Sequence, residues 1–113
     1  MIDLNHKHLR IIKDILARHV AGCEVRAFGS RVTGQAKRYS DPDLSIVSDE
    51  ALSPRTLALL EDDFAESDLP FKVDVLDWSA VSDPFRQIIM QDYAVLQPAH
   101  PGGAIAGPQA SRE

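Results

Sequence analysis

The sequence lacks several features that mark secreted, membrane-bound and disulfide-linked proteins. Cys23 is the only cysteine among the 113 residues, so the chain cannot form an internal disulfide. No apolar run approaches the roughly 18 residues that a membrane-spanning helix needs. The segment 1–8 also has no apolar stretch like that of a signal peptide. We therefore expect a cytoplasmic protein that does not bind a membrane.

Basic residues are scarce in the middle of the chain. Between Asp41 and Asp83 lie 12 acidic and only 2 basic residues, whereas the rest of the chain has 5 acidic and 10 basic residues. Such a segment repels polyanions and attracts cations. We therefore do not expect a nucleic-acid strand as a direct partner.

The length suits a single domain, and the hydrophobic fraction of 44% and the charged fraction of 26% are those of a globular protein. The last residues contain several prolines and glycines and have little to bury. We therefore predict one domain at residues 1–96 and a disordered C-terminal tail at 97–113.

Helical and strand patterns alternate along this domain. Apolar residues at helical spacing predict a first helix, which Asp3 or Asn5 can cap and Gly22 can end, and further helices from Pro54 and from Asp83. A short helix is also predicted to start near Ser30. Alternating and β-rich segments predict strands at Glu24–Phe28, Asp43–Val47, Phe71–Trp78 and Ala94–Leu96. In the last helix we expect Phe85, Ile88 and Ile89 to face inward. The fold class is therefore α/β (α+β), a small mixed sheet flanked by helices.

The first candidate functional segment is Gly29-Ser30, at the end of the first predicted strand. Glycine lets backbone amides approach a phosphate closely, and the Ser30 hydroxyl can donate a hydrogen bond to the same group. A helix that begins here would favour an anion through its free N–H groups. Alone, a Gly-Ser pair after a strand is more often a plain turn.

The second candidate segment is Asp41-Pro42-Asp43. Side chains two apart on an extended chain point to the same side, and two close carboxylates raise each other's pKa. A divalent cation relieves this repulsion, and Mg²⁺ typically takes one or two carboxylates together with substrate phosphates. An isolated Asp-x-Asp is nevertheless more often a pair of surface acids.

The third candidate is Asp74, which lies inside the apolar strand pattern "FKVDVLDW". An aspartate in mid-strand is disfavoured by propensity and costly if it is buried without a partner. If this strand pairs beside Asp43–Val47, Asp74 converges with the other two acids. The alternative is a surface-facing residue on a half-exposed strand.

Together these segments resemble the polymerase β-type nucleotidyltransferases, and above all their minimal nucleotidyltransferase branch. Members of that branch similarly have Phe-Gly-Ser-Arg, then a glycine, then Ser-Asp-x-Asp-Leu. Here the matching residues are Phe28–Arg31, Gly34 and Ser40–Leu44. The resemblance covers roughly residues 9–96. One departure is Pro42, which stands where an apolar residue other than proline is more usual and which places Asp41 in the loop entering the strand.

The resemblance implies a polymerase β-type fold and a two-metal nucleotidyl transfer. Gly29 and Ser30, with Arg31 and Ser40, would bind the phosphates of ATP. Asp41, Asp43 and Asp74 would be the catalytic residues and would hold two Mg²⁺ ions. In the minimal branch, the implied biology is an antitoxin that transfers AMP to a hydroxyl of a cognate HEPN-type ribonuclease toxin.

Two other functions stay open at this point. A binding-only antitoxin would keep the fold and inhibit its toxin sterically. A transferase for a small molecule, such as an aminoglycoside, normally carries an additional substrate-binding domain, for which 113 residues leave little room. The complete set of phosphate-binding and acidic residues favours the enzyme that modifies a protein.

Overall fold

Four strands form one mixed sheet in the order β3-β2-β1-β4 in the computed structural model, which describes residues 2, 4–34 and 41–99. The strands are β1 (Glu24–Phe28), β2 (Asp43–Val47), β3 (Asp74–Asp77) and β4 (Ala94–Gln97). The inner strand β1 pairs antiparallel with β2 and with β4, and β2 pairs parallel with β3. This mixed sheet confirms the predicted fold class.

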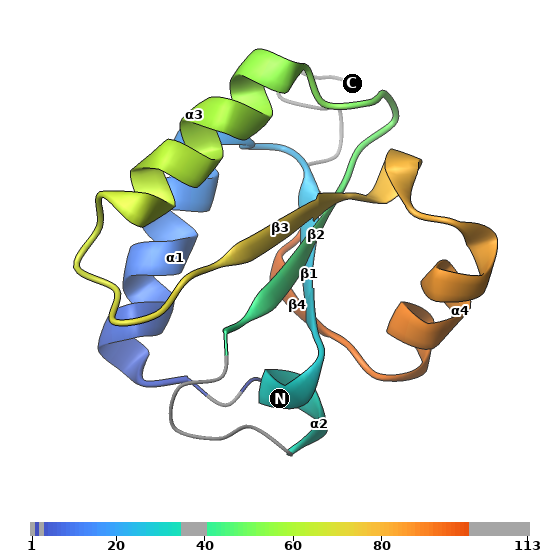
Figure 1. Cartoon of the computed structure of the whole chain (residues 1–113), viewed down its shortest axis with the longest axis horizontal. Coiled ribbons are helices and arrows are strands. Elements are labelled where there is room, and N and C mark those ends of the chain that lie inside the picture. Colours follow the sequence, from blue (N-terminus) through green and yellow to red (C-terminus); the bar gives the residue numbers. More distant parts are fainter. Residues whose placement is uncertain (1, 3, 35–40, 100–113) are drawn as a thin grey trace, which may run out of the picture.

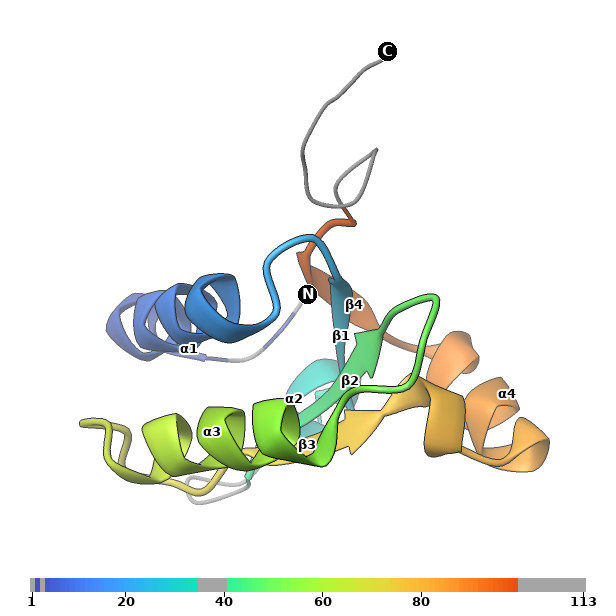
Figure 2. The same cartoon turned by 90° about the horizontal axis from the view of Figure 1, so that it is seen from above.

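Two helices cover one face of the sheet. In all, the described residues form the helices α1 (His6–His19), α2 (Ser30–Thr33), α3 (Pro54–Ala65) and α4 (Asp83–Gln91), and a short 3-10 turn η1 (Trp78–Ala80). Figures 1 and 2 show α1 and α3 together on one side of the sheet and α4 on the other. Because side chains alternate along a strand, Val25 and Ala27 enter the core below α1 and α3. Their neighbours Arg26 and Phe28 therefore lie on the opposite face, with α4.

Local sequence signals fix the ends of the two covering helices. The Asn5 side chain caps α1 by accepting a hydrogen bond from the Lys7 amide (2.7 Å). Ser53 caps α3 in the same way through the Thr56 amide (3.0 Å), and Pro54 follows as the first helical residue.

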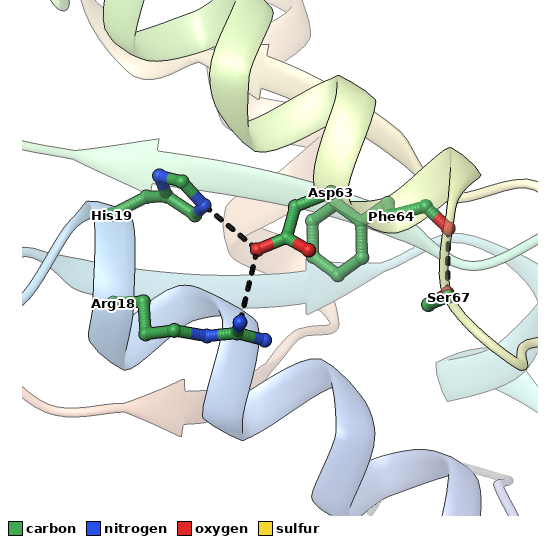
Figure 3. A network of polar contacts seen from close by, with 5 residues as sticks. All are labelled: Arg18, His19, Asp63, Phe64 and Ser67. Carbon is green, nitrogen blue, oxygen red and sulfur yellow. Dashed lines mark hydrogen bonds and ion pairs between the residues drawn. The ribbon is translucent and has the colours of Figure 1, made fainter.

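A polar contact also joins the two helices to each other (Figure 3). Asp63 of α3 lies 2.9 Å from the His19 ring and 3.5 Å from the Arg18 guanidinium, measured between the polar atoms. These contacts connect the last turn of α1 to the second half of α3, so the two helices lie on the sheet as one layer. None of the helices in the described part of the chain is long and apolar enough to cross a membrane.

The third strand is shorter than the predicted Phe71–Trp78 and spans Asp74–Asp77. Before it, the Lys72 amide donates to the side chain of Asp41 (3.3 Å) instead of to a neighbouring strand. After it, Asp77 caps η1 through the Ser79 amide (3.0 Å) and accepts from the Leu52 amide (2.9 Å). The strand prediction was therefore wrong at both ends, because side chains of Asp41 and Asp77 take over the backbone hydrogen bonds there.

The inward direction predicted for the apolar side chains of α4 was wrong for Ile88 and only partly right for Phe85. Ile89 is 1% exposed, but Phe85 is 37% and Ile88 is 59% exposed. Successive residues of a helix are about 100° apart, so the run Ile88-Ile89-Met90 covers more of its circumference than one buried face can accept. Ile89 is buried, and Phe85 contacts Phe28 of β1 while part of its ring stays exposed.

Strand β4 extends one residue beyond the predicted domain end at 96. Gln97 belongs to the strand, and its side-chain amide donates to the carbonyls of Val20 and Cys23, each at 2.9 Å. Through these two bonds the last strand is tied to the loop between α1 and β1. Residues 100–113 of the predicted tail lie outside the described residues, so their disorder stays a prediction.

Truncation after Pro98 should therefore leave thermal stability almost unchanged, whereas Gln97→Ala should lower it. The Val20 carbonyl keeps a donor in the Cys23 amide (3.1 Å), but the Cys23 carbonyl loses its side-chain donor, which costs about 1–3 kcal/mol. Thermal melts of the two variants and the full chain measure the difference. Equal melting temperatures for Gln97→Ala and the full chain, or a clear loss on truncation, would contradict this boundary.

Candidate active site

Asp43 and Asp74 lie side by side on the sheet face that carries α4. The two residues are register partners on the parallel strands β2 and β3, and neighbouring strands are about 4.8 Å apart. The Asp74 amide donates to the Pro42 carbonyl (3.0 Å), which holds this register. The pairing of these two strands, which the convergence of the acids required, is confirmed.

Asp41 is the third acid, and it lies in the loop just before β2. Its side chain is exposed and accepts the hydrogen bond from the Lys72 amide described above. This bond ties the loop that precedes β2 to the segment that precedes β3. Asp41 therefore lies just before the strand that carries Asp43, and its hydrogen bond helps to align β2 and β3.

The electrostatics of Asp43 reflect all three acids. Burial raises the pKa of Asp43, and the negative charges of Asp74 and Asp41 raise it further. Two or more carboxylates that raise each other's pKa are in an unfavourable arrangement unless a cation or a proton neutralises them. The charge distribution around Asp43 is thus suited to a bound cation.

Gly29 lies directly against the Asp43 carboxylate. A Cβ atom at position 29 would stand 2.3 Å from Asp43 Oδ2, closer than any real contact of that kind. Gly29 also has a φ of +83°, a conformation that favours glycine. Glycine is therefore required at position 29 for two reasons, its positive φ and the close approach of the Asp43 carboxylate.

The other predicted phosphate-binding residues are placed less completely. Ser30 begins the short helix α2, in which the amides of Val32 and Thr33 donate to the Gly29 carbonyl at 3.0 and 3.1 Å. The Arg31 guanidinium lies 5.3 Å from the centre of the Phe71 ring. Ser40 lies outside the described residues.

Two open hollows meet at Asp43, and Phe85 of α4 borders both. The first has a volume of about 620 Å³ and is lined by Phe28, Gly29, Thr33, Asp43, Phe85, Ile88, Ile89, Gln91 and Asp92. The second, of about 400 Å³, is lined by Phe28, Asp43, Glu61, Lys72, Val73, Asp74, Val75, Leu76 and Phe85. The Phe85 ring packs edge-on against Phe28, with centroids 5.9 Å apart. This role of Phe85 was not predicted from the sequence. The apolar residues of α4 cover more of the helix than one buried face needs, and this could have indicated it.

Comparison with known proteins identifies the family of this site. Residues 9–96 match the nucleotidyltransferase domain family. The chain belongs to this family. The family and the enzyme class that the motif predicted are thereby confirmed, and this enzyme class acts on a nucleotide with the help of a divalent metal ion.

One relative is similar over most of its length. The chain is 48% identical over 96 residues to a Haemophilus influenzae protein named probable protein adenylyltransferase MntA. The aligned part covers 85% of this chain and 84% of that relative.

Solved structures share the fold at lower identity. A crystal structure of a toxin–antitoxin with AMP-PNP has a TM-score of 0.66 at 24% identity, covering 78% of this chain and 71% of that one. The toxin–antitoxin MntA–HpeT mutant has a TM-score of 0.67 at 22% identity, with coverages of 82% and 73%. A structure of a tri-AMPylated Shewanella oneidensis HEPN toxin with its MNT antitoxin has a TM-score of 0.57 at 19% identity, with coverages of 78% and 71%. These likenesses concern the fold.

The acids present fit a divalent cation that shares its ligands with a substrate. Within residues 2, 4–34 and 41–99, no group of three or more His, Cys, Asp or Glu side chains could by itself hold a metal ion. Mg²⁺ does not require such a group, because it usually binds one or two carboxylates and completes its shell with phosphates and water. The pair Asp43–Asp74, with the raised pKa of Asp43, matches that pattern.

Proposed function

We propose that this chain transfers AMP from ATP to a tyrosine hydroxyl of a cognate HEPN-type ribonuclease toxin and thereby acts as its antitoxin. The observation that carries the proposal is that Asp43 and Asp74 are register partners on neighbouring strands and that Gly29 lies against the Asp43 carboxylate. The 48% identity to a protein named as a probable protein adenylyltransferase supports a protein as the acceptor. The toxin–antitoxin complexes that share the fold support the same assignment.

The residues of the site divide into two roles. Gly29 and Ser30, together with Arg31 and Ser40, would hold the triphosphate, because a glycine lets backbone amides approach a phosphate closely. Asp74 lies on the far side of Asp43 from Gly29 along the sheet and borders the second hollow. The acceptor hydroxyl would approach there, and Asp74 would assist the loss of its proton.

Asp43, Asp74 and Asp41 would hold two Mg²⁺ ions. Such a pair stabilises the attacking and the leaving oxygen of an in-line displacement. In the transfer, the acceptor oxygen forms a bond to the α-phosphorus of ATP while the bond from that phosphorus to the bridging oxygen breaks. Pyrophosphate leaves, and the acceptor keeps the AMP. A phosphate added near a ribonuclease site places negative charge where RNA phosphates bind, and this inhibits the toxin.

Co-expression with the cognate toxin tests this proposal. We expect intact-mass spectrometry to find the toxin heavier by one or more AMP units, and toxin co-expressed with an Asp43→Asn chain to be unmodified. Tyrosine should carry the added group when the modified toxin is digested and sequenced by mass. An unmodified toxin held inactive in a stable complex would overturn the proposal and identify a binding-only antitoxin.

A further inference from the structure

Large apolar side chains are exposed mainly on one short part of the chain. Among the described residues, five large hydrophobic side chains are exposed: Leu59, Phe85, Ile88, Met90 and Val95. All except Leu59 lie on α4 or on the strand that follows it. Residues two apart on a helix point about 160° apart, so Ile88 and Met90 lie on different sides of α4. Phe85 and Ile88 both line the hollow next to Asp43, and we call these two residues the α4 surface. Exposed apolar side chains beside a hollow commonly mark a binding site.

Long side chains anchor α4 firmly below this surface. The Arg26 guanidinium of β1 lies 4.9 Å from the Trp78 ring centre and 5.0 Å from that of Tyr93. Its Nη1 atom is 3.2 Å from the Met90 sulfur. The Arg86 guanidinium also lies over the Trp78 ring, 5.1 Å from its centre, and donates to the Trp78 carbonyl at 2.8 Å. The apolar residues are therefore presented by a helix whose position is fixed.

The α4 surface is continuous with the catalytic carboxylates. Phe85 borders both hollows that meet at Asp43, and Ile88 lines the larger of them. A protein that delivers a side chain to Asp43 and Asp74 must pass over these residues. Figure 2 shows that α4 stands on the opposite side of the sheet from α1 and α3, so the helical layer does not obstruct that approach.

Charge indicates what kind of partner fits. Asp83 and Asp92 are exposed at the two ends of α4, and the Asp83 side chain is 94% exposed although it lies 3.8 Å from Arg86. The Arg26 side chain is mostly buried and paired with Glu24, so Arg86 is the one basic residue of α4 that stands against these two aspartates. The apolar centre thus has an acidic rim, which is complementary to a basic rim and repels a like-charged one. A second copy of this surface would bring its own aspartates against these.

We propose that the α4 surface docks the acceptor protein through an apolar contact with a basic rim, and so brings its hydroxyl to Asp43 and Asp74. This inference rests on the proposed function in one respect, namely that the acceptor is a protein. The contact itself does not depend on whether AMP is transferred. Binding and transfer are therefore measured separately.

The experiment compares Ile88→Glu with the matched variant Leu59→Glu. Both residues are largely exposed, at 59% and 45%, so neither substitution removes a core contact. Leu59 lies on α3, on the other side of the sheet. Thermal melts establish that both variants fold. Affinity for the cognate toxin is then measured by titration calorimetry, and AMP transfer is followed by mass spectrometry over a range of toxin concentrations.

We expect Ile88→Glu to weaken toxin binding about tenfold or more, the effect of losing a central interface residue, and Leu59→Glu to bind like wild type. The KM for the toxin should rise by the same factor in Ile88→Glu. Equal toxin affinity in the two variants overturns the inference, as does a loss of kcat at unchanged KM.

Two further outcomes distinguish the inference from the proposed function. If the toxin binds wild type and fails to bind Ile88→Glu, yet is never modified, the docking surface stands and the proposed transfer does not. If wild type is a dimer in analytical ultracentrifugation and Ile88→Glu is a monomer, the surface joins two copies of this chain, and the docking inference is wrong.

Discussion

Replacing Asp43 by asparagine should reduce AMP transfer by more than about 100-fold and leave the fold intact. Substitution of groups that merely orient a metal ligand costs 10–100-fold in activity, and Asp43 is the central acid of the proposed metal site. Asparagine has nearly the same shape, so the β2–β3 pairing should persist. Initial rates of toxin modification and circular dichroism measure the two effects.

The exposed Asp62 of α3 provides a matched control for the removal of one negative charge. Asp62→Asn should transfer AMP at the wild-type rate, because this residue lies on α3 and lines neither of the two hollows that meet at Asp43. If Asp43→Asn transfers AMP as fast as Asp62→Asn, the assignment of the metal site is wrong.

Asp43→Asn should also change how the stability of the protein depends on pH. The pKa of Asp43 is raised in the folded protein above its ordinary value of 3.8, so the folded state binds this proton more tightly than the unfolded chain does. The charged form therefore opposes folding above the raised pKa, and this penalty disappears as the pH falls toward 3.8. In EDTA, Asp43→Asn should be more stable than wild type at pH 7 and similar to it below pH 3.8. Added Mg²⁺ should raise the melting temperature of wild type and have a smaller effect on the variant.

Replacing Gly29 by alanine should cause the second large loss of activity. The new methyl group would stand 2.3 Å from Asp43 Oδ2, so the carboxylate must move. A displacement of about 1 Å at a reacting centre can reduce the rate roughly 100-fold. Alanine at a φ of +83° also costs about 1–2 kcal/mol of stability.

Gly34 separates these two effects, because it has a φ of +84° and no described residue lies within 4 Å of the Cβ atom that a substitution would add. Gly34→Ala should therefore lose a similar amount of stability in thermal melts while keeping most of the transfer activity. Comparable activity losses in the two variants would mean that backbone strain, and not the approach to Asp43, explains the effect of Gly29→Ala.

Much of the fold could be predicted from local signals in the sequence. The strands Glu24–Phe28 and Asp43–Val47 have the predicted bounds, and the helix that follows Ser53-Pro54 begins where its cap and proline indicate. These signals succeed because a cap, a proline at the first helical position and the alternation of a strand each act within a few residues. The convergence of Asp43 and Asp74 was predictable only on the condition that their strands pair.

The remaining features depend on contacts between distant residues. The end of β3 is set by Asp77, whose carboxylate is shared between the Ser79 and Leu52 amides. The exposure of Phe85 and Ile88 follows from the narrow contact of α4 with the sheet, where Ile89 alone is buried. A local pattern cannot supply these facts, because an apolar stripe has the same periodicity whether it meets the core or a partner protein.

The position of β1 inside the sheet also has a consequence for folding during synthesis. β1 is the first strand to be synthesised, but one of its two neighbours is β4, the last. A nascent chain emerges from the ribosome with its N-terminal part first, at roughly 5–20 residues per second. One edge of β1 therefore stays open until residues 94–97 have been translated, and an unpaired edge is a template for association with other chains. Closure of the sheet thus waits for these residues, so a chain that is stopped before them cannot close it.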